Sequence, residues 1–311
     1  MGTSPRIRIR AHAKINLTLH VRGVRPDGYH DLETVFQSLA LHDVLTCQVR
    51  PGPLNIRCDD PGLPTDERNL VWRAAQRLWE QLGRTGPVRG VEIVLDKQIP
   101  MQAGLGGGSA DAAAALVALS RAWAPRRRVD LAAVAAQIGA DVPYFLMGGT
   151  ALGLSRGDDL YPLPDLPPYH VVLGLPAFGV STVDAYGWFD RDGAGASGTR
   201  VAGVVEPRRA SVARVAGIPA WPGRHLIVAN DLEAPVAARH PEIGALRDTL
   251  VRSGARAAAM TGSGSAVFGL FDSVMPARRA ARALAGIGAM ALVTTTVDRP
   301  TCLRGLRMVA R

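Results

Sequence analysis

Residues 91–116 read VEIVLDKQIPMQAGLGGGSADAAAAL, and this stretch decides which kind of fold the chain can adopt. Residues 91–99 have the composition of a strand, which Pro100 should stop. A glycine-rich loop follows at 104–109, and the alanine-rich residues 110–124 predict a helix. Where such a loop enters a helix, free backbone N–H groups converge with the positive end of the helix dipole. The stretch therefore predicts a site for an anion such as a phosphate.

The glycine-rich loop belongs to neither of the two most familiar nucleotide-binding types. No Gly-Lys-Ser or Gly-Lys-Thr of a Walker A loop occurs, and Ser109 stands where the dinucleotide-binding pattern needs its third glycine. Ser109 could cap the following helix, and its hydroxyl could also reach a magnesium ion or a phosphate. A flexible connection is the alternative interpretation, and the strand before the loop and the helix after it argue against that.

A strand near the amino terminus carries two polar side chains on one side. Residues 6–21 alternate with period two, so Lys14 and Asn16 project in the same direction from a half-buried strand or a bent strand pair. Only Lys14 and Lys97 are lysines among 36 basic residues. An ammonium is a compact point charge that suits a phosphoryl site, so both lysines are candidates for such a site.

Two further segments allow a structural and a chemical interpretation. The second glycine-rich segment, 260–265, lies between strand-like runs, so it predicts a hairpin loop or a second wall of a phosphate site. Asp141 precedes Pro143 and would cap a short helix. A carboxylate fixed at a helix start can also accept a proton from a substrate hydroxyl when a cation lies nearby.

Chain length and composition indicate two α+β domains with a cleft between them. The proline-rich residues 161–168 suggest a connection, so we expect domains at 1–160 and 161–311. Residues 190–220 show little periodicity and predict a long surface loop. The last third alternates helical and strand patterns and should end in a strand at 294–297.

Several functional classes are disfavoured by composition. No apolar run is long enough to span a membrane and no signal-peptide pattern is present, so we expect a cytoplasmic protein. Three dispersed cysteines fit neither a disulfide framework nor a zinc site. The net charge of +9 is scattered and aromatic residues make up 5%, which favours a small anionic substrate over nucleic acid.

Six segments, in order along most of the chain, resemble the 4-diphosphocytidyl-2-C-methyl-D-erythritol kinase family. This family lies within the superfamily of galactokinase, homoserine kinase, mevalonate kinase and phosphomevalonate kinase. The segments are AHAKINLTL at 11–19, RPDGYHDLETVFQ at 25–37, GLGGGSADAA at 104–113, IGADVPYF at 138–145, NDLE at 230–233 and MTGSGSAVFG at 260–269. Both glycine-rich segments are common to the superfamily, whereas the segment around Tyr29 is specific to the family.

The resemblance implies a fold and a reaction. It implies an N-terminal domain of the ribosomal-protein type, a ferredoxin-like C-terminal domain and an active site in the cleft between them. ATP, with Mg²⁺, would phosphorylate the 2-hydroxyl of 4-diphosphocytidyl-2-C-methyl-D-erythritol in the non-mevalonate route to isoprenoids. The partner is thus a small cytidine diphosphate substrate, with no nucleic acid and no membrane.

The resemblance also implies roles for particular residues. Asp141 would take the hydroxyl proton and Lys14 would stabilise the developing charge. Tyr29 would stack on the cytosine and His30 would hydrogen-bond it. The other substrate residues would be Asn16, Thr182 and Tyr186, with Phe178 as the runner-up for the second aromatic. The ATP phosphates would lie on Pro100, Met101, Gln102, Ala103, Gly104, Leu105, Gly106, Gly107, Gly108, Ser109 and Ala110.

Two departures and two alternatives accompany this resemblance. Residues 155–158 read SRGD where the family more often has GRGE, and 190–225 are irregular. A homoserine or mevalonate kinase would share the glycine-rich loops, but the segment from Asp27 to His30 argues against it. An RNA-binding protein of the ribosomal type would fit the charge, but would leave Lys14 and Asp141 without a task. The sequence does not predict an oligomeric state.

Overall fold

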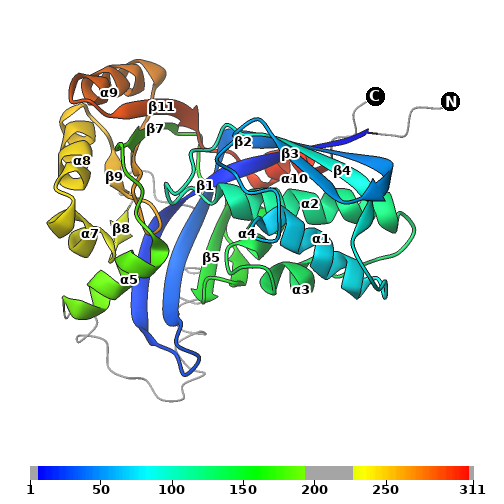
Figure 1. Cartoon of the computed structure of the whole chain (residues 1–311). Helices are drawn as coiled ribbons and strands as arrows, with labels where there is room; N and C mark the ends of the chain where they lie inside the picture. Colours follow the sequence, from blue (N-terminus) through cyan, green and yellow to red (C-terminus); the bar gives the residue numbers. More distant parts are fainter. Residues whose placement is uncertain (1–5, 193–226, 308–311) are drawn as a thin grey trace.

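A computed structural model of the chain describes residues 6–192 and 227–307, and the predicted surface loop at 190–220 falls almost entirely outside them. The described part contains one large sheet and one four-stranded sheet, each with its own helices (Figure 1).

Two long antiparallel strands form the spine of the molecule, β1 (Arg6–Val24) and β2 (His30–Pro53). A turn joins them: Gly28 has a positive φ of 82° and donates its N–H to the carbonyl of Arg25 at 3.0 Å. The sheet runs β3-β4-β2-β1-β8, while β5 pairs with β2 and β6 pairs with β5. The remaining strands are β3 (Asn55–Cys58), β4 (Arg89–Asp96), β5 (Thr150–Ser155), β6 (Asp159–Pro162) and β8 (Ala229–Asn230).

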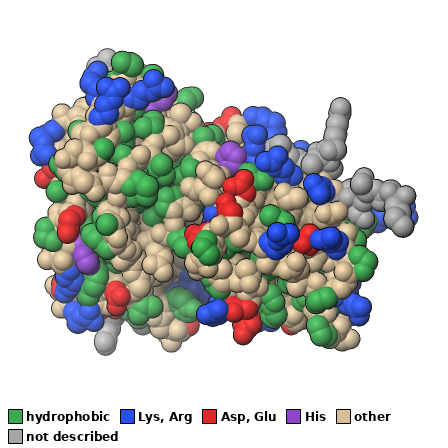
Figure 2. All heavy atoms as spheres, turned by 45° about the horizontal axis from the view of Figure 1, so that its top comes forward, with side chains coloured by type: hydrophobic (Ala, Val, Ile, Leu, Met, Phe, Trp, Pro, Cys, Tyr) green, Lys and Arg blue, Asp and Glu red, His purple; other side chains and the backbone are tan. Residues whose placement is uncertain are grey.

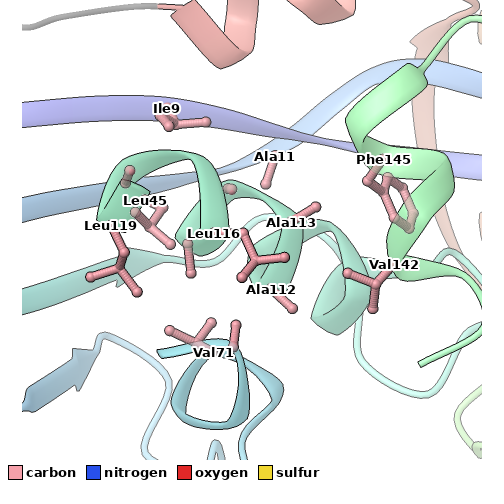
Figure 3. Packing of buried hydrophobic residues seen from close by; sticks show 14 of the residues in the cluster. Ile9, Ala11, Leu45, Val71, Ala112, Ala113, Leu116, Leu119, Val142 and Phe145 are labelled. Carbon is pink, nitrogen blue, oxygen red and sulfur yellow. The ribbon is translucent and has the colours of Figure 1, made fainter. Parts of the chain in front are cut away.

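Four helices belong to this first sheet, and α2 lies at the centre of the core. They are α1 (Leu70–Gln81), α2 (Gly107–Trp123), α3 (Leu131–Ala136) and α4 (Val142–Met147). Figure 3 shows α2 between the strands that carry Ile9 and Leu45 and the helix α1 that carries Val71. The run of small alanines in α2 lets both neighbours pack closely against it.

The second sheet has the antiparallel order β11-β7-β10-β9. Its strands are β7 (His170–Leu175), β9 (Ala257–Met260), β10 (Val267–Phe271) and β11 (Met290–Thr295). Helices α8 (Glu242–Arg252) and α9 (Val274–Gly286) pack on it, α7 (Glu233–Arg239) lies beside α8, and α5 (Thr182–Arg191) lies beside α7 (Figure 1). This arrangement confirms the predicted α+β class and the ferredoxin-like second domain.

β1 connects the two halves because its successive residues enter different hydrophobic clusters. Ile9 packs with α2, Ile15 packs with residues of the second sheet, and Leu19 packs with α7 and α8. The prediction of a half-buried strand is therefore wrong for the middle of β1. Lys14 and Asn16 are only 4% and 2% exposed there, because the second sheet covers the face that a single-domain protein would leave to water.

Two element boundaries and one helix cap differ from the predicted ones. β4 ends at Asp96 rather than at Ile99, because the N–H groups of Gln98 and Ile99 donate to the carboxylate of Asp43 instead of to a strand. α2 begins three residues earlier than predicted, so Ser109 lies in its first turn. Gly106 holds the cap position without a side-chain hydrogen bond, and Ser109 is not the cap.

The end of the chain was also predicted incompletely. A helix, α10 (Arg299–Arg307), follows β11, and it packs back on β1 and α4. The expected division between residues 160 and 161 falls inside β6. We propose a division just after β6, with α10 returning to the first half of the chain.

The surface shows no feature of a membrane protein or of an extended basic tract. No helix in residues 6–192 and 227–307 is both long and apolar enough to cross a membrane. Figure 2 shows Lys and Arg side chains in separate groups around the visible face rather than in one continuous patch.

Candidate active site

One large cleft of about 1040 Å³ contains nearly all the residues that the sequence singled out. Its walls include Lys14, Asn16, Tyr29, His30, Pro100, Met101, Gln102, Ala103, Gly104, Leu105, Gly106, Gly107, Gly108, Ser109, Asp141, Thr182 and Tyr186. Two predicted residues are not on these walls: Ala110 is 1% exposed behind the loop, and Phe178 stacks on His240 with ring centroids 4.3 Å apart. The cleft is large enough for two substrates together.

The side chains of Lys14 and Asn16 meet on β1, as their spacing predicts. Lys14 Nζ donates to Asn16 Oδ1 at 2.6 Å, and Asn16 Nδ2 donates to Thr34 Oγ1 at 2.7 Å. Thr34 in turn donates to the carbonyl of Thr18 at 2.6 Å. This chain of buried hydrogen bonds fixes which end of the Asn16 amide faces the ammonium, and so holds Lys14 in one orientation.

Asp141 lies beside Lys14, a contact that sequence spacing could not predict. Asp141 Oδ2 is 3.4 Å from Lys14 Nζ, and the two side chains are 34% and 5% exposed. Asp141 occupies the cap position of α4, but its side chain makes no capping hydrogen bond. The carboxylate therefore faces the cleft and the ammonium instead of satisfying the start of its own helix.

The two glycine-rich segments pack directly against each other. A Cβ on Gly104, whose φ is 73°, would lie 2.1 Å from the carbonyl oxygen of Thr261. Thr261 Oγ1 accepts the backbone N–H of Asn16 at 3.0 Å. A Cβ on Gly262 would lie 3.4 Å from Lys14 Nζ. The second segment thus forms the wall next to the ammonium, and glycine is required for that approach.

The first glycine-rich loop turns into α2 next to the same ammonium. Gly106 has a φ of 72°, and a Cβ there would lie 2.6 Å from Phe145 Cζ and 3.1 Å from Lys14 Cγ. Since no side chain caps α2, the N–H groups of its first turn can receive an anion from the cleft.

Aromatic side chains line the opposite part of the cleft. His30 stacks on Tyr186 with ring centroids 4.6 Å apart and an angle of 26° between the planes. Burial raises the pKa of Tyr186, so its phenol stays neutral. Tyr29 is 57% exposed, and the guanidinium of Arg156 lies 5.4 Å from its ring centre. Both stacking candidates therefore border the same space, with Tyr29 presenting its ring to it.

Several cleft residues were missed by the sequence analysis. Asp190 Oδ1 lies 2.9 Å from His30 Nε2. Ser263 Oγ lies 3.1 Å from Thr182 Oγ1, but Ser263 belongs to the second glycine-rich segment, which the sequence analysis did single out. Thr34 and Arg156 also line the cleft. Lone polar residues of this kind carry no local signal, because only the fold brings them to the site.

Both halves of the chain are similar to known proteins. The GHMP kinases N terminal domain matches residues 69–149, and the GHMP kinases C terminal domain matches residues 218–288. The chain is 43% identical to a 4-diphosphocytidyl-2-C-methyl-D-erythritol kinase of Deinococcus radiodurans, over 88% of this chain and 87% of the relative. It is 43% identical to the kinase of that name from Pelotomaculum thermopropionicum, over 93% of this chain and 97% of the relative.

Solved structures agree with this relationship. A crystal structure of 4-(cytidine 5'-diphospho)-2C-methyl-D-erythritol kinase is 36% identical, with a TM-score of 0.71, covering 93% of this chain and 99% of that chain. A homoserine kinase from Cytophaga hutchinsonii, 21% identical with a TM-score of 0.66 and 96% of each chain covered, shares the fold. With such identity over nearly its whole length, the chain belongs to the family of 4-diphosphocytidyl-2-C-methyl-D-erythritol kinases, within the GHMP kinases.

Proposed function

We propose that this chain transfers the terminal phosphoryl group of ATP to the 2-hydroxyl of 4-diphosphocytidyl-2-C-methyl-D-erythritol, a step of the non-mevalonate route to isoprenoids. The observation that carries this proposal is the pair of Asp141 and Lys14, 3.4 Å apart, on the wall between the glycine-rich loop and the aromatic part of one cleft. Relatives that match this chain over most of their length bear the corresponding name.

The pair suits phosphoryl transfer to an alcohol. Asp141 accepts the proton of the substrate hydroxyl while that oxygen forms a bond to the terminal phosphorus of ATP, and the bond from this phosphorus to the bridging oxygen of ADP breaks. Lys14 stabilises the negative charge on the attacking oxygen and on the transferring group. Lys14 as a whole is 4% exposed, and a buried charge interacts more strongly than one in water.

In this proposal the phosphates of ATP and the cytosine of the second substrate bind at opposite ends of the cleft. Residues 100–110, with the uncapped start of α2, bind the phosphates of ATP. Tyr29 stacks on the cytosine, His30 hydrogen-bonds it, and Tyr186 supports His30 by its stacking contact. Asn16 and Thr182 contact the remainder of the cytidylated substrate.

Magnesium fits this site as an ion that arrives with the nucleotide. In residues 6–192 and 227–307 no group of three His, Cys, Asp or Glu side chains could hold a metal. Mg²⁺ commonly keeps waters and phosphate oxygens and uses few protein ligands, so the hydroxyl of Ser109 is a sufficient candidate. When bound, it would neutralise charge on the phosphates. A cytoplasmic setting is also proposed, since all three cysteines are free thiols.

Direct assay of phosphoryl transfer tests the proposal. ADP formation should require the cytidylated polyol, and the free polyol phosphate, homoserine and mevalonate should support little or none. The phosphorylated position can be read by phosphorus NMR of the product. Turnover of homoserine or mevalonate in preference to the cytidylated polyol would assign the chain another activity of the superfamily. ATP-independent binding of RNA would support the nucleic-acid alternative instead.

A further inference from the structure

The second lysine of the chain, Lys97, lines the same cleft beside the glycine-rich loop, and it belongs to a cluster that the reaction above does not use. Its Nζ donates to Asp43 Oδ2 and, at 2.6 Å, to Asp111 Oδ2. The three side chains are 7%, 0% and 3% exposed. Ion pairs excluded from water to this degree are much stronger than surface pairs when their geometry is good, and costly when one member is lost.

The cluster joins both ends of the loop. Lys97 comes three residues before Pro100, where the loop begins, and Asp111 lies in the second turn of α2, where the loop has become a helix. Asp43 belongs to β2, and its Oδ1 accepts the N–H groups of Gln98 at 2.6 Å and Ile99 at 2.8 Å. The chain entering the loop is therefore held to the sheet, and the chain leaving it is held to Lys97.

The first turn of α2 packs closely against Lys97 and its neighbour Ile99. A Cβ on Gly107 would lie 3.0 Å from Ile99 Cγ2 and 3.5 Å from Lys97 Nζ. The N–H groups that face the cleft thus have their positions set from below. A shift of the ion pair would move the first turn of the helix, and with it the anion site.

The cluster holds two buried carboxyl groups around one ammonium. Asp111 Oδ1 is buried and has no hydrogen-bond partner among the described residues. Burial raises the pKa of Asp111 to about 7. The ammonium of Lys97 opposes this rise, and the carboxylate of Asp43 adds to it. Burial opposes the charge of Lys97, but the carboxylates of Asp111 and Asp43 outweigh it and raise its pKa.

Other ionisable groups approach this cluster only on the side of Lys97. The backbone N–H of Lys97 donates to Asp59 Oδ1 at 3.1 Å, and the thiol of Cys58 lies within electrostatic range of its ammonium. Lys97 and Asp43 are the groups that act on Asp111 itself.

We propose that Lys97, Asp43 and Asp111 form an ionic clamp that sets the distance between the two ends of the glycine-rich loop, and that the affinity for the nucleotide phosphates depends on its integrity. These are positioning residues, because they act through the loop. The inference rests on the proposed ATP site, and it adds to that site a group that no local motif reveals.

The test measures ATP affinity of the full chain by titration calorimetry, without the second substrate. Lys97→Met and Asp111→Leu should each weaken ATP binding about tenfold to a hundredfold, the scale of a lost hydrogen bond between charged groups. Turnover at saturating ATP should change far less, because Lys14 and Asp141 stay in place. The double variant should be little weaker than the worse single one.

A matched control uses an ion pair between β2 and β4. Arg50 of β2 and Glu92 of β4 lie 2.8 Å apart, away from the loop, and Arg50→Met should leave ATP affinity unchanged. If Lys97→Met does not fold, the double variant decides, since its remaining carboxylate keeps the backbone partners Gln98 and Ile99. If Asp111→Leu binds ATP normally while Lys97→Met does not, Lys97 is a direct ligand and the clamp is refuted.

The melting temperature of each variant separates the clamp from a purely structural role. Asp111→Asn keeps an acceptor for Lys97, so it should bind ATP more tightly than Asp111→Leu. Lost stability with parent-like ATP affinity would refute the clamp, and a parent chain that binds no ATP would refute the proposed function instead.

Discussion

Replacement of Asp141 by asparagine distinguishes a proton acceptor from a helix cap. Asparagine caps a helix about as well as aspartate, so a capping role predicts normal stability and normal turnover. In the structure the Asp141 side chain makes no capping bond and lies 3.4 Å from Lys14 Nζ. We therefore expect Asp141→Asn to lose turnover while the protein stays folded.

The expected magnitudes differ by several kcal/mol. A positioned proton acceptor contributes about a hundredfold to ten-thousandfold in rate, or about 2.7 to 5.5 kcal/mol in the activation barrier. The loss in folding stability should stay within about 1 kcal/mol, because the Asp141 side chain is a third exposed and Lys14 keeps its hydrogen bond to Asn16. Lys14→Met combined with Asp141→Asn should be little slower than the worse single change.

The assay follows ADP release at saturating substrates together with the melting temperature. Asp130 offers a matched control, because it does cap α3, accepting the N–H groups of Ala132 and Ala133 at 3.1 Å. Asp130→Ala should lose about 1 kcal/mol of stability and keep its turnover. Near-normal turnover of Asp141→Asn, or a loss explained by unfolding, would remove Asp141 from the mechanism.

Three further predictions concern the base, the loop and the core. Tyr29→Ala should weaken binding of the cytidylated substrate by about 1 to 3 kcal/mol with ATP affinity unchanged, and calorimetry showing no loss would contradict the stacking role. Gly108→Ala should raise the melting temperature, since the new methyl meets only Leu70 at 3.7 Å. The same methyl should weaken ATP binding by covering backbone N–H groups, and an ATP affinity equal to that of the parent chain would refute the phosphate site there. Burial lowers the pKa of His12 to about 4, from an unfolded value near 6.5. Between pH 6.5 and pH 4 the unfolded chain therefore binds more protons than the folded chain. The free energy of unfolding should fall as the pH drops through this range, by about 3 kcal/mol in total. Denaturant unfolding from pH 7 to 4 should show this fall in the parent chain and a smaller one in His12→Gln.

The predicted glycine-rich loop and the helix after it needed only local information. A strand, a run of glycines and a run of alanines each specify their own backbone, so the order of elements from 91 to 124 followed from propensity and periodicity. The capping role of Asp130 is equally local, since a cap is a contact between residues two or three apart.

The errors came from contacts between distant residues. β4 ends early because the N–H groups of Gln98 and Ile99 donate to the carboxylate of Asp43. No residue within ten positions of β4 predicts this contact. The second sheet buried the middle of β1, which a period-two pattern alone assigns to a half-exposed strand.

The sequence by itself determined the class of the fold, the anion-binding loop and the side-by-side projection of Lys14 and Asn16, because each depends on neighbours along the chain. Only the tertiary structure decided that Asp141 lies beside Lys14, that the glycine segment at Thr261 forms the opposite wall, and that Lys97 is held between two carboxylates. These contacts join residues up to about two hundred and fifty positions apart, and they form because hydrophobic packing of both sheets on β1 brings those residues together.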